Sequence, residues 1–194
     1  MIGVVLCGGQ SFRMGADKGL LRHETIVWAR IAYDKLAAMQ IPVKISVNDN
    51  QYTTYAEIFS AEELIPDNTE FRVKGPLLGV ISAHLRYPAD SIFVLACDML
   101  LMEVIILKQL LKVFHEQQHS GAWIYSSDGE PEPLCGIYKP ESIESVISMY
   151  ESGSLSKHSM KFMLDHINPF TIPLLADDKK FFRNFNSHAE LNGL

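Results

Sequence analysis

The chain has 194 residues, of which 47% are hydrophobic and 21% charged, as is typical of one soluble globular domain. Its formal net charge of −6, without a visible basic stripe, argues against a nucleic-acid partner. No apolar run approaches the ~18 residues of a membrane span, the first run ends too early at Gly8 for a signal peptide, and the three cysteines are far apart. We therefore expect a cytoplasmic protein without a membrane span, a disulfide framework or a zinc ribbon.

Short apolar runs alternate with longer amphipathic stretches along the chain. In chain order, we predict a strand at 2–6, a helix at 26–39, strands at 43–47 and 63–65, a helix at 76–85, a strand at 91–96, a helix at 103–117, strands at 122–126 and 134–138, and helices at 140–150 and 156–164. Pro76 would stand in the first turn of its helix, and Ser156 would be an N-cap. Ser187 and Glu190 have the spacing of a capping box before a short final helix.

This alternation, with near-continuous apolar strands, is typical of a mainly parallel sheet flanked by helices. The sequence has no repeat and no long linker, so we expect a single α/β domain over residues 1–194. In such sheets, ligands bind at the carboxyl ends of the strands, near the point where the strand order reverses.

A glycine-rich loop, LCGGQSFRMGADKGLL at residues 6–21, follows the first predicted strand. Glycines let backbone N–H groups approach phosphate oxygens, and Arg13 and Lys18 can neutralise a polyphosphate and its leaving group. The loop is not a Walker A motif, because the chain has no Gly-Lys pair, and it lacks the Gly-x-Gly of a dinucleotide fingerprint. A tight turn that merely needs glycine would not account for Arg13, Gly15, Asp17 and Lys18 together.

The loop resembles the opening signature of the molybdenum cofactor guanylyltransferases, the MobA-type nucleotidyltransferases. That signature is Leu-Ala-Gly-Gly, a variable residue, Ser, another variable residue, Arg-Met-Gly, one more residue, then Asp-Lys, and Cys7 replaces its alanine here. Related sugar and isoprenoid nucleotidyltransferases more often end the motif with Pro-Lys. Further segments resemble the family in its order, from residue 2 to about residue 191: SVNDN, LIPD, KGPLLGV, FVLACDML, EPEPLCGIY and FFRNFNSHAEL.

The resemblance implies a Rossmann-like nucleotidyltransferase that joins GMP from GTP to molybdopterin and releases pyrophosphate, with Mg²⁺ bound by Asp98. By position, the nucleotide contacts would be Leu6, Cys7, Gly8, Gly9, Lys18, Asn48, Asp67 and Asp98. Arg13, Lys18 and Asp98 would be catalytic, and Asn184 and Asn186 would lie on the pterin side. Mg²⁺ suits this chemistry because it takes few carboxylates and bridges phosphate oxygens. Transient contacts with other cofactor-biosynthesis proteins or with acceptor enzymes are also expected.

Several of these residues have a simpler structural alternative. Asp98 could cap the helix that starts near residue 103, and Asp67 could be a turn residue. Asn48 could be only a turn former. Asn186 or Ser187 could cap the last helix. The cysteines are expected to be small packing residues.

Two departures from the family pattern leave other functions open. Leu100 stands where the family usually has a proline beside the metal, which would stiffen that turn. The stretch RHETIVWAR lacks the glycine-containing turn common before the first helix. The alternatives are a cytidylyltransferase that acts on the same pterin and a nucleotide-binding regulator without catalysis.

A second motif, HEQQH at residues 115–119, fits the His-Glu-x-x-His pattern of zinc hydrolases. The core face of its predicted helix is formed by Leu107, Leu110, Leu111 and Phe114. The two histidines instead share a stripe with lysines at the solvated helix end, where histidine favours the helix dipole. We therefore interpret the motif as a surface feature.

Overall fold

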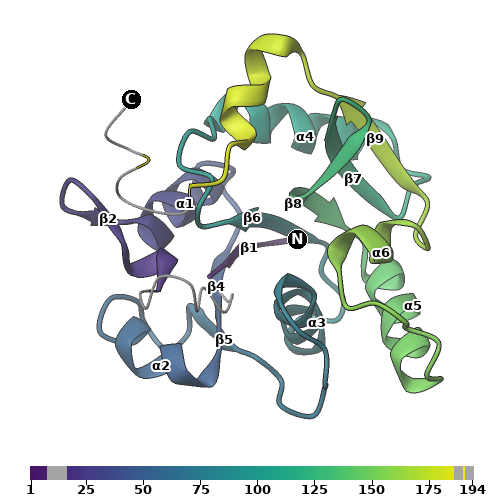
Figure 1. The fold of residues 1–194 in the computed structure, drawn as a ribbon, viewed down its shortest axis with the longest axis horizontal. Coiled ribbons are helices and arrows are strands. Elements are labelled where there is room, and N and C mark those ends of the chain that lie inside the picture. Colours follow the sequence, from purple (N-terminus) through teal and green to yellow (C-terminus); the bar gives the residue numbers. More distant parts are fainter. Residues whose placement is uncertain (8–16, 186–189, 191–194) are drawn as a thin grey trace.

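A seven-stranded sheet forms the centre of the computed structural model, which describes residues 1–7, 17–185 and 190 (Figure 1). Its spatial order is β5-β4-β1-β6-β8-β7-β9. The strands are β1 (Ile2–Leu6), β4 (Val43–Val47), β5 (Leu64–Pro66), β6 (Ile92–Ala96), β7 (Ala122–Ser127), β8 (Glu130–Tyr138) and β9 (Pro169–Pro173). Only β8 pairs antiparallel with its neighbours, β6 and β7, whereas the other pairings are parallel. The predicted fold class, a Rossmann-like α/β domain with a mainly parallel sheet, is confirmed.

Helices cover both faces of the sheet. The helices are α1 (Trp28–Ala37), α2 (Asp49–Tyr55), α3 (Pro76–Arg86), α4 (Val104–Glu116), α5 (Pro140–Glu151) and α6 (Met160–Leu164), with 3₁₀ turns η1 (Lys18–Leu20) and η2 (Ala176–Phe182). Helices α1, α2 and α4 contribute to one buried core, and α3, α5 and α6 contribute to the other (Figure 1). Within the described residues, no helix has the length and apolar character needed to cross a bilayer.

Strand β1 shows why the central strands are apolar throughout. Val5 belongs to the core beneath α1 and α4, whereas Val4 and Leu6 belong to the core beneath α3 and α5. Because successive strand residues point to opposite faces, a strand covered on both sides must be apolar at every position. Helix α3 approaches these strands closely at Gly79, where a Cβ atom would lie 2.4 Å from Ser46 Oγ.

The first helix is shorter than predicted, because a small hairpin precedes it. Strands β2 (Arg22–His23) and β3 (Ile26–Val27) pair antiparallel, so α1 begins at Trp28 and ends at Ala37. The hairpin turns without glycine: Glu24 itself adopts a left-handed conformation with φ of 53°. The missing glycine therefore does not prevent a turn before the first helix.

Helix α6 is also shorter than predicted, and Ser156 is not its N-cap. The hydroxyl of Ser159 accepts from Phe162 N at 3.1 Å, so the helix begins at Met160. Residues before it complete the end of α5, where Ser154 N and Leu155 N both donate to Met149 O. The remaining predicted elements match the structure to within one or two residues, except that β8 begins earlier, at Glu130. The predicted capping box of Ser187 and Glu190 cannot be compared, since Ser187 lies outside the described residues.

Candidate functional site

Four of the predicted site residues follow four neighbouring parallel strands. Cys7 follows β1, Asn48 follows β4 and Asp67 follows β5, while Asp98 comes two residues after β6. The strands are in register at this edge, because Leu6 of β1 pairs with both Ser46 and Ala96. The sheet therefore brings these residues to one edge, which is formed by the carboxyl ends of the parallel strands. This edge includes the end of β1, which lies between β4 and β6, where the chain order reverses.

Lys18 and Asp98 form an ion pair across this edge. Lys18 Nζ donates to Asp98 Oδ2 at 3.0 Å, and the two side chains are only 21% and 15% exposed. The other carboxylate oxygen, Asp98 Oδ1, is buried and receives no hydrogen bond from the part of the chain that the structure describes. A buried carboxylate oxygen without a donor is poorly stabilised, so this atom is suited to bind a cation.

The residue before Lys18 fixes the backbone around it. Asp17 is the N-cap of η1, where its Oδ1 accepts from Gly19 N at 2.9 Å and from the Tyr55 hydroxyl at 3.0 Å. Gly19 has no space for a side chain, because a Cβ atom would lie 2.1 Å from the Tyr55 oxygen. Burial first, and then the nearby Cys7, Cys97 and Asp17, raise the pKa of Tyr55, which keeps its hydroxyl protonated as a donor.

Asn48 is the N-cap of α2 rather than only a turn former. Its Oδ1 accepts from Gln51 N at 3.1 Å, and Gln51 Oε1 accepts from Asn48 N at 2.9 Å, which is a complete capping box. The sequence interpretation missed α2 and Gln51, although the Asn-x-x-Gln spacing at 48–51 was a signal for both.

Asp67 has an unusual environment for a carboxyl group. Burial first, and the nearby Asp49 carboxylate second, raise the pKa of Asp67 to about 6. Its backbone N–H continues the sheet by donating to Val47 O at 2.8 Å. A carboxyl group whose charge is disfavoured in this way is stabilised by an incoming cation or hydrogen-bond donor, and such groups cluster at functional sites.

The backbone of β1 and Cys7 is already engaged at this edge. Leu6 O accepts from Cys97 N at 3.2 Å, and Cys7 N donates to Ser46 O at 3.2 Å. A carbonyl oxygen has a second lone pair, but the Cys7 N–H has no further hydrogen to donate. At these two residues, contacts to a nucleotide base would therefore fall on carbonyl oxygens rather than on the Cys7 amide.

The three cysteines are buried free thiols, as expected for packing residues. Cys7 and Cys97 follow the adjacent strands β1 and β6. A hydrogen bond to Cys7, followed by burial, raises the pKa of the Cys97 thiol well above its usual value. The Cys97 thiol is therefore protonated near neutral pH and not a nucleophile.

The loop after Asp98 is held by two other parts of the chain. Phe185 N donates to Asp98 O at 3.0 Å, which places the exposed Asn184 directly before the residue that contacts this loop. Leu100 packs beside the buried Trp28 and Phe185, and Lys35 Nζ donates to Leu100 O at 2.6 Å. These contacts fix the turn that lacks the family's proline. Gly8, Gly9, Arg13 and Asn186 lie outside the described residues.

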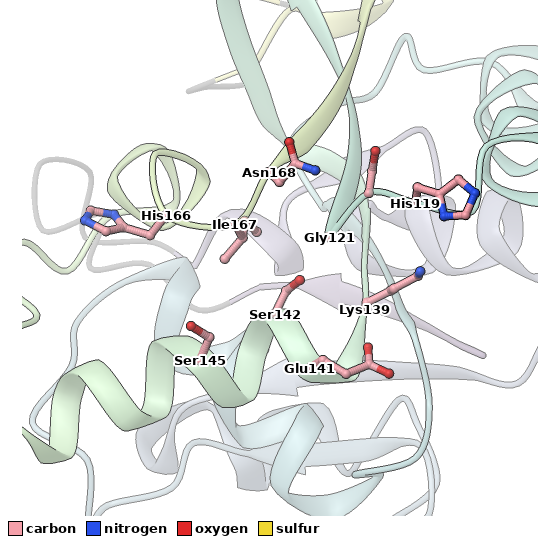
Figure 2. Close-up of a pocket in the computed structure, with 10 residues that line it drawn as sticks. His119, Gly121, Lys139, Glu141, Ser142, Ser145, His166, Ile167 and Asn168 are labelled. Atoms are coloured by element: carbon pink, nitrogen blue, oxygen red, sulfur yellow. The ribbon is translucent and has the colours of Figure 1, made fainter.

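A pocket of about 390 Å³ lies beside the amino ends of β7 and β9, opposite the carboxyl ends of the strands that the predicted site residues follow. Figure 2 shows the residues that line it. It is lined by the segments before β7, around the start of α5 and before β9, with Lys139, Ser142 and Asn168 among its residues. Its lining contains none of the described residues predicted to contact the nucleotide. The pocket and the Lys18–Asp98 pair are therefore two separate sites.

The HEQQH motif does not form a zinc-hydrolase helix. Helix α4 ends at Glu116, so His115 lies in its last turn and His119 lies beyond it, and both side chains are exposed. Leu107 and Leu110 face the core, as predicted. Across residues 1–7, 17–185 and 190, no group of three or more His, Cys, Asp or Glu side chains is arranged to hold a metal ion.

Comparisons with known proteins agree with this geometry. A family model described as MobA-like NTP transferase domain matches residues 3–167. The chain is 30% identical to the molybdenum cofactor guanylyltransferase of Shewanella sp. (strain W3-18-1), over 95% of this chain and 90% of that protein. Its fold is similar to molybdopterin-guanine dinucleotide biosynthesis protein A from Archaeoglobus fulgidus, with a TM-score of 0.79, 22% identity and coverage of 100% and 96%. It is also similar to a cytidylyltransferase from Leptospira borgpetersenii, with a TM-score of 0.64, 15% identity and coverage of 96% and 80%.

Proposed function

This chain belongs to the MobA-like NTP transferase family, and we propose that it transfers GMP from GTP to molybdopterin and releases pyrophosphate. The observation that carries the proposal is the partly buried Lys18–Asp98 pair at the strand ends, with one Asp98 oxygen left without a described donor. The names of similar proteins point to the same substrates: one relative is a guanylyltransferase of the molybdenum cofactor.

The reaction joins two negatively charged partners, so charge neutralisation and positioning are its main requirements. An oxygen of the terminal phosphate of molybdopterin attacks the α-phosphorus of GTP. A new P–O bond forms there, and the bond to the β-phosphate oxygen breaks as pyrophosphate leaves. The attacking phosphate is already ionised, so no general base is needed. Lys18, held beside the strand ends by Asp17 and Gly19, neutralises charge on the phosphates.

The residues at this edge fit a magnesium ion. Asp98 Oδ1 would bind it, with phosphate oxygens and water as the other ligands, as is usual for Mg²⁺. The ion would neutralise charge on the phosphates when bound. Asp67, whose pKa burial raises to about 6, would be stabilised by the approach of the same positive charge. Asn184 would lie on the pterin side. The three free cysteines fit the reducing cytoplasm in which we place the protein.

Base choice separates this proposal from the cytidylyltransferase alternative, because fold similarity extends to both kinds of enzyme. A site that pairs the polar edge of a base can reject the wrong base by roughly 10⁴-fold. We expect GTP to be preferred over CTP by a large factor. The test is competition between labelled GTP and CTP for molybdopterin-dependent transfer, with and without EDTA. A preference for CTP would assign the cytidylyltransferase, and nucleotide binding without transfer would assign a regulator.

A further inference from the structure

The side chain of Gln51 connects three segments at the carboxyl ends of the strands, where we propose that the nucleotide binds. Its Oε1 accepts from Asn48 N at 2.9 Å, and its Nε2 donates to Cys7 O at 3.0 Å and to Asp17 Oδ2 at 2.6 Å. The two N–H groups of the amide are thus both used. These contacts reach the end of β1, the start of η1 and the end of β4, and the farthest of them in sequence, Cys7, lies 44 residues from Gln51.

Asp17 connects the Gln51 side chain to the backbone around Lys18. One oxygen of its carboxylate contacts Gln51, and the other accepts from Gly19 N and the Tyr55 hydroxyl. Asp17 and Gly19 flank Lys18, so the backbone is held on both sides of the lysine that reaches Asp98. Tyr55 and Gln51 lie on the same helix, α2, and hydrogen bonds to an ionised carboxylate are the stronger kind.

We propose that Gln51 is a positioning residue for nucleotide transfer: its amide sets the Cys7 carbonyl and, through Asp17, the backbone that carries Lys18. This inference rests on the proposed function. One N–H of the Gln51 amide acts at Cys7, where the sequence predicts a nucleotide contact, and this hydrogen bond governs nucleotide affinity. The other N–H acts through Asp17 on Lys18, and it governs turnover together with the part of the nucleotide affinity that Lys18 supplies.

The first test replaces the amide by an apolar side chain of similar length. Gln51→Met is expected to lower kcat/KM for GTP by roughly 10- to 100-fold, the range for loss of a hydrogen bond to a charged group. The matched control is Gln118→Met, the same change in an exposed turn, where the amide donates to His115 O at 3.5 Å and to no other group among the described residues. Circular dichroism and thermal unfolding establish that both variants are folded.

The second test separates the effects of the two hydrogen bonds that the Gln51 amide donates, to Cys7 O and to Asp17 Oδ2. In Gln51→Glu, the new carboxylate faces the Asp17 carboxylate and cannot donate to Cys7 O. In the double variant Asp17→Asn/Gln51→Glu, the new amide at position 17 can donate to the new carboxylate, while its oxygen still accepts from Gly19 N and Tyr55. The net charge is that of the wild type. We expect kcat to recover roughly tenfold over Gln51→Glu, with KM for GTP still raised.

The outcomes also distinguish this inference from the proposed function. A kcat/KM for Gln51→Met within about threefold of the wild type would overturn the positioning role. So would a folded double variant with no more activity than Gln51→Glu. If the wild type transfers no nucleotide to molybdopterin, the proposed function fails, and GTP affinity measured by calorimetry decides the role of Gln51: a tenfold loss in Gln51→Met supports it, and equal affinities, or no GTP binding by the wild type, overturn it.

Discussion

The two halves of the sheet both carry lysine–carboxylate pairs, but in different environments. In the half formed by β5, β4, β1 and β6, Lys18 and Asp98 are 21% and 15% exposed. In the half formed by β8, β7 and β9, Lys179 pairs with Asp128 at 2.6 Å, yet the two side chains are 38% and 78% exposed. Exposed ion pairs are screened by water and contribute little. A short distance between the charged atoms therefore does not by itself identify a pair that acts in the reaction.

The topology explains this difference. Four parallel strands end at one edge and bring residues that are distant in sequence into contact, as with Lys18 and Asp98, which are 80 residues apart. In the other half, β7 and β8 form a hairpin whose Asp128–Gly129 turn is left-handed at both residues. Aspartate and asparagine are both favoured at the first position of such a turn, and the carboxylate of Asp128 is left in solvent.

The largest expected effect is at Asp98. Asp98→Asn removes the negative charge that faces Lys18 and replaces one of the two carboxylate oxygens with an NH2 donor, so the side chain can no longer serve both Lys18 and Mg²⁺. Pyrophosphate release should fall roughly 10²- to 10³-fold with the fold intact. Asp128→Asn, the same change in the exposed pair, should retain wild-type turnover. Steady-state pyrophosphate release from GTP with molybdopterin, at saturating Mg²⁺, measures both. Near wild-type turnover in Asp98→Asn would contradict the assignment of Asp98.

The second effect is at the partner lysine. Lys18→Ala should weaken GTP binding and slow transfer, because a charged hydrogen bond of this kind is worth about 1.5–3 kcal/mol. Lys179→Ala removes an even shorter contact, 2.6 Å against 3.0 Å, from the exposed half and should leave both quantities unchanged. Calorimetric titration with GTP, together with single-turnover transfer, tests the difference. Equal affinities and rates in the two variants would place Lys18 among ordinary surface charges.

A smaller effect concerns the loop after Asp98 and its pH dependence. Burial lowers the pKa of Lys35 to about 8, although Glu103 opposes the shift. The unfolded chain, with a lysine pKa near 10.4, binds more protons between these values, so unfolding free energy should rise with pH in this window. The wild type should gain about 2 kcal/mol relative to Lys35→Met by pH 9.5. Urea unfolding at pH 7 and pH 9.5 measures this, and a pH-independent difference would contradict it.

The sequence predicted the parallel half of the molecule better than the other half. Apolar strands followed by Cys7, Asn48, Asp67 and Asp98 were sufficient, because parallel strands place their carboxyl ends at one edge. Helix α2 was missed because its seven residues, DNQYTTY, show no apolar periodicity, although the capping box at its start was a signal for a helix.

Strand β9 and the 3₁₀ turn η2 were missed for a different reason. β9 begins and ends with proline, at Pro169 and Pro173, which argues against a central strand, but β9 is an edge strand where proline is tolerated. The Lys35 contact to Leu100 O could not be predicted, since two residues 65 apart meet only in the folded chain. Sequence reasoning thus predicted which residues follow the parallel strands, but not the contacts among them.

The smallest expected effect is at the motif that suggested a different enzyme. His115 and His119 are exposed, and helix α4 ends between them, so they cannot hold a zinc ion as two histidines one helical turn apart would. His119 also lines the pocket beside the amino ends of β7 and β9 (Figure 2). Replacing both histidines with glutamine should therefore change neither nucleotidyl transfer nor metal content. The measurements are pyrophosphate release and elemental analysis of the purified protein. Stoichiometric zinc that disappears in the double variant would establish a metal site in the antiparallel half, and a loss of transfer without a loss of metal would connect the two edges of the sheet.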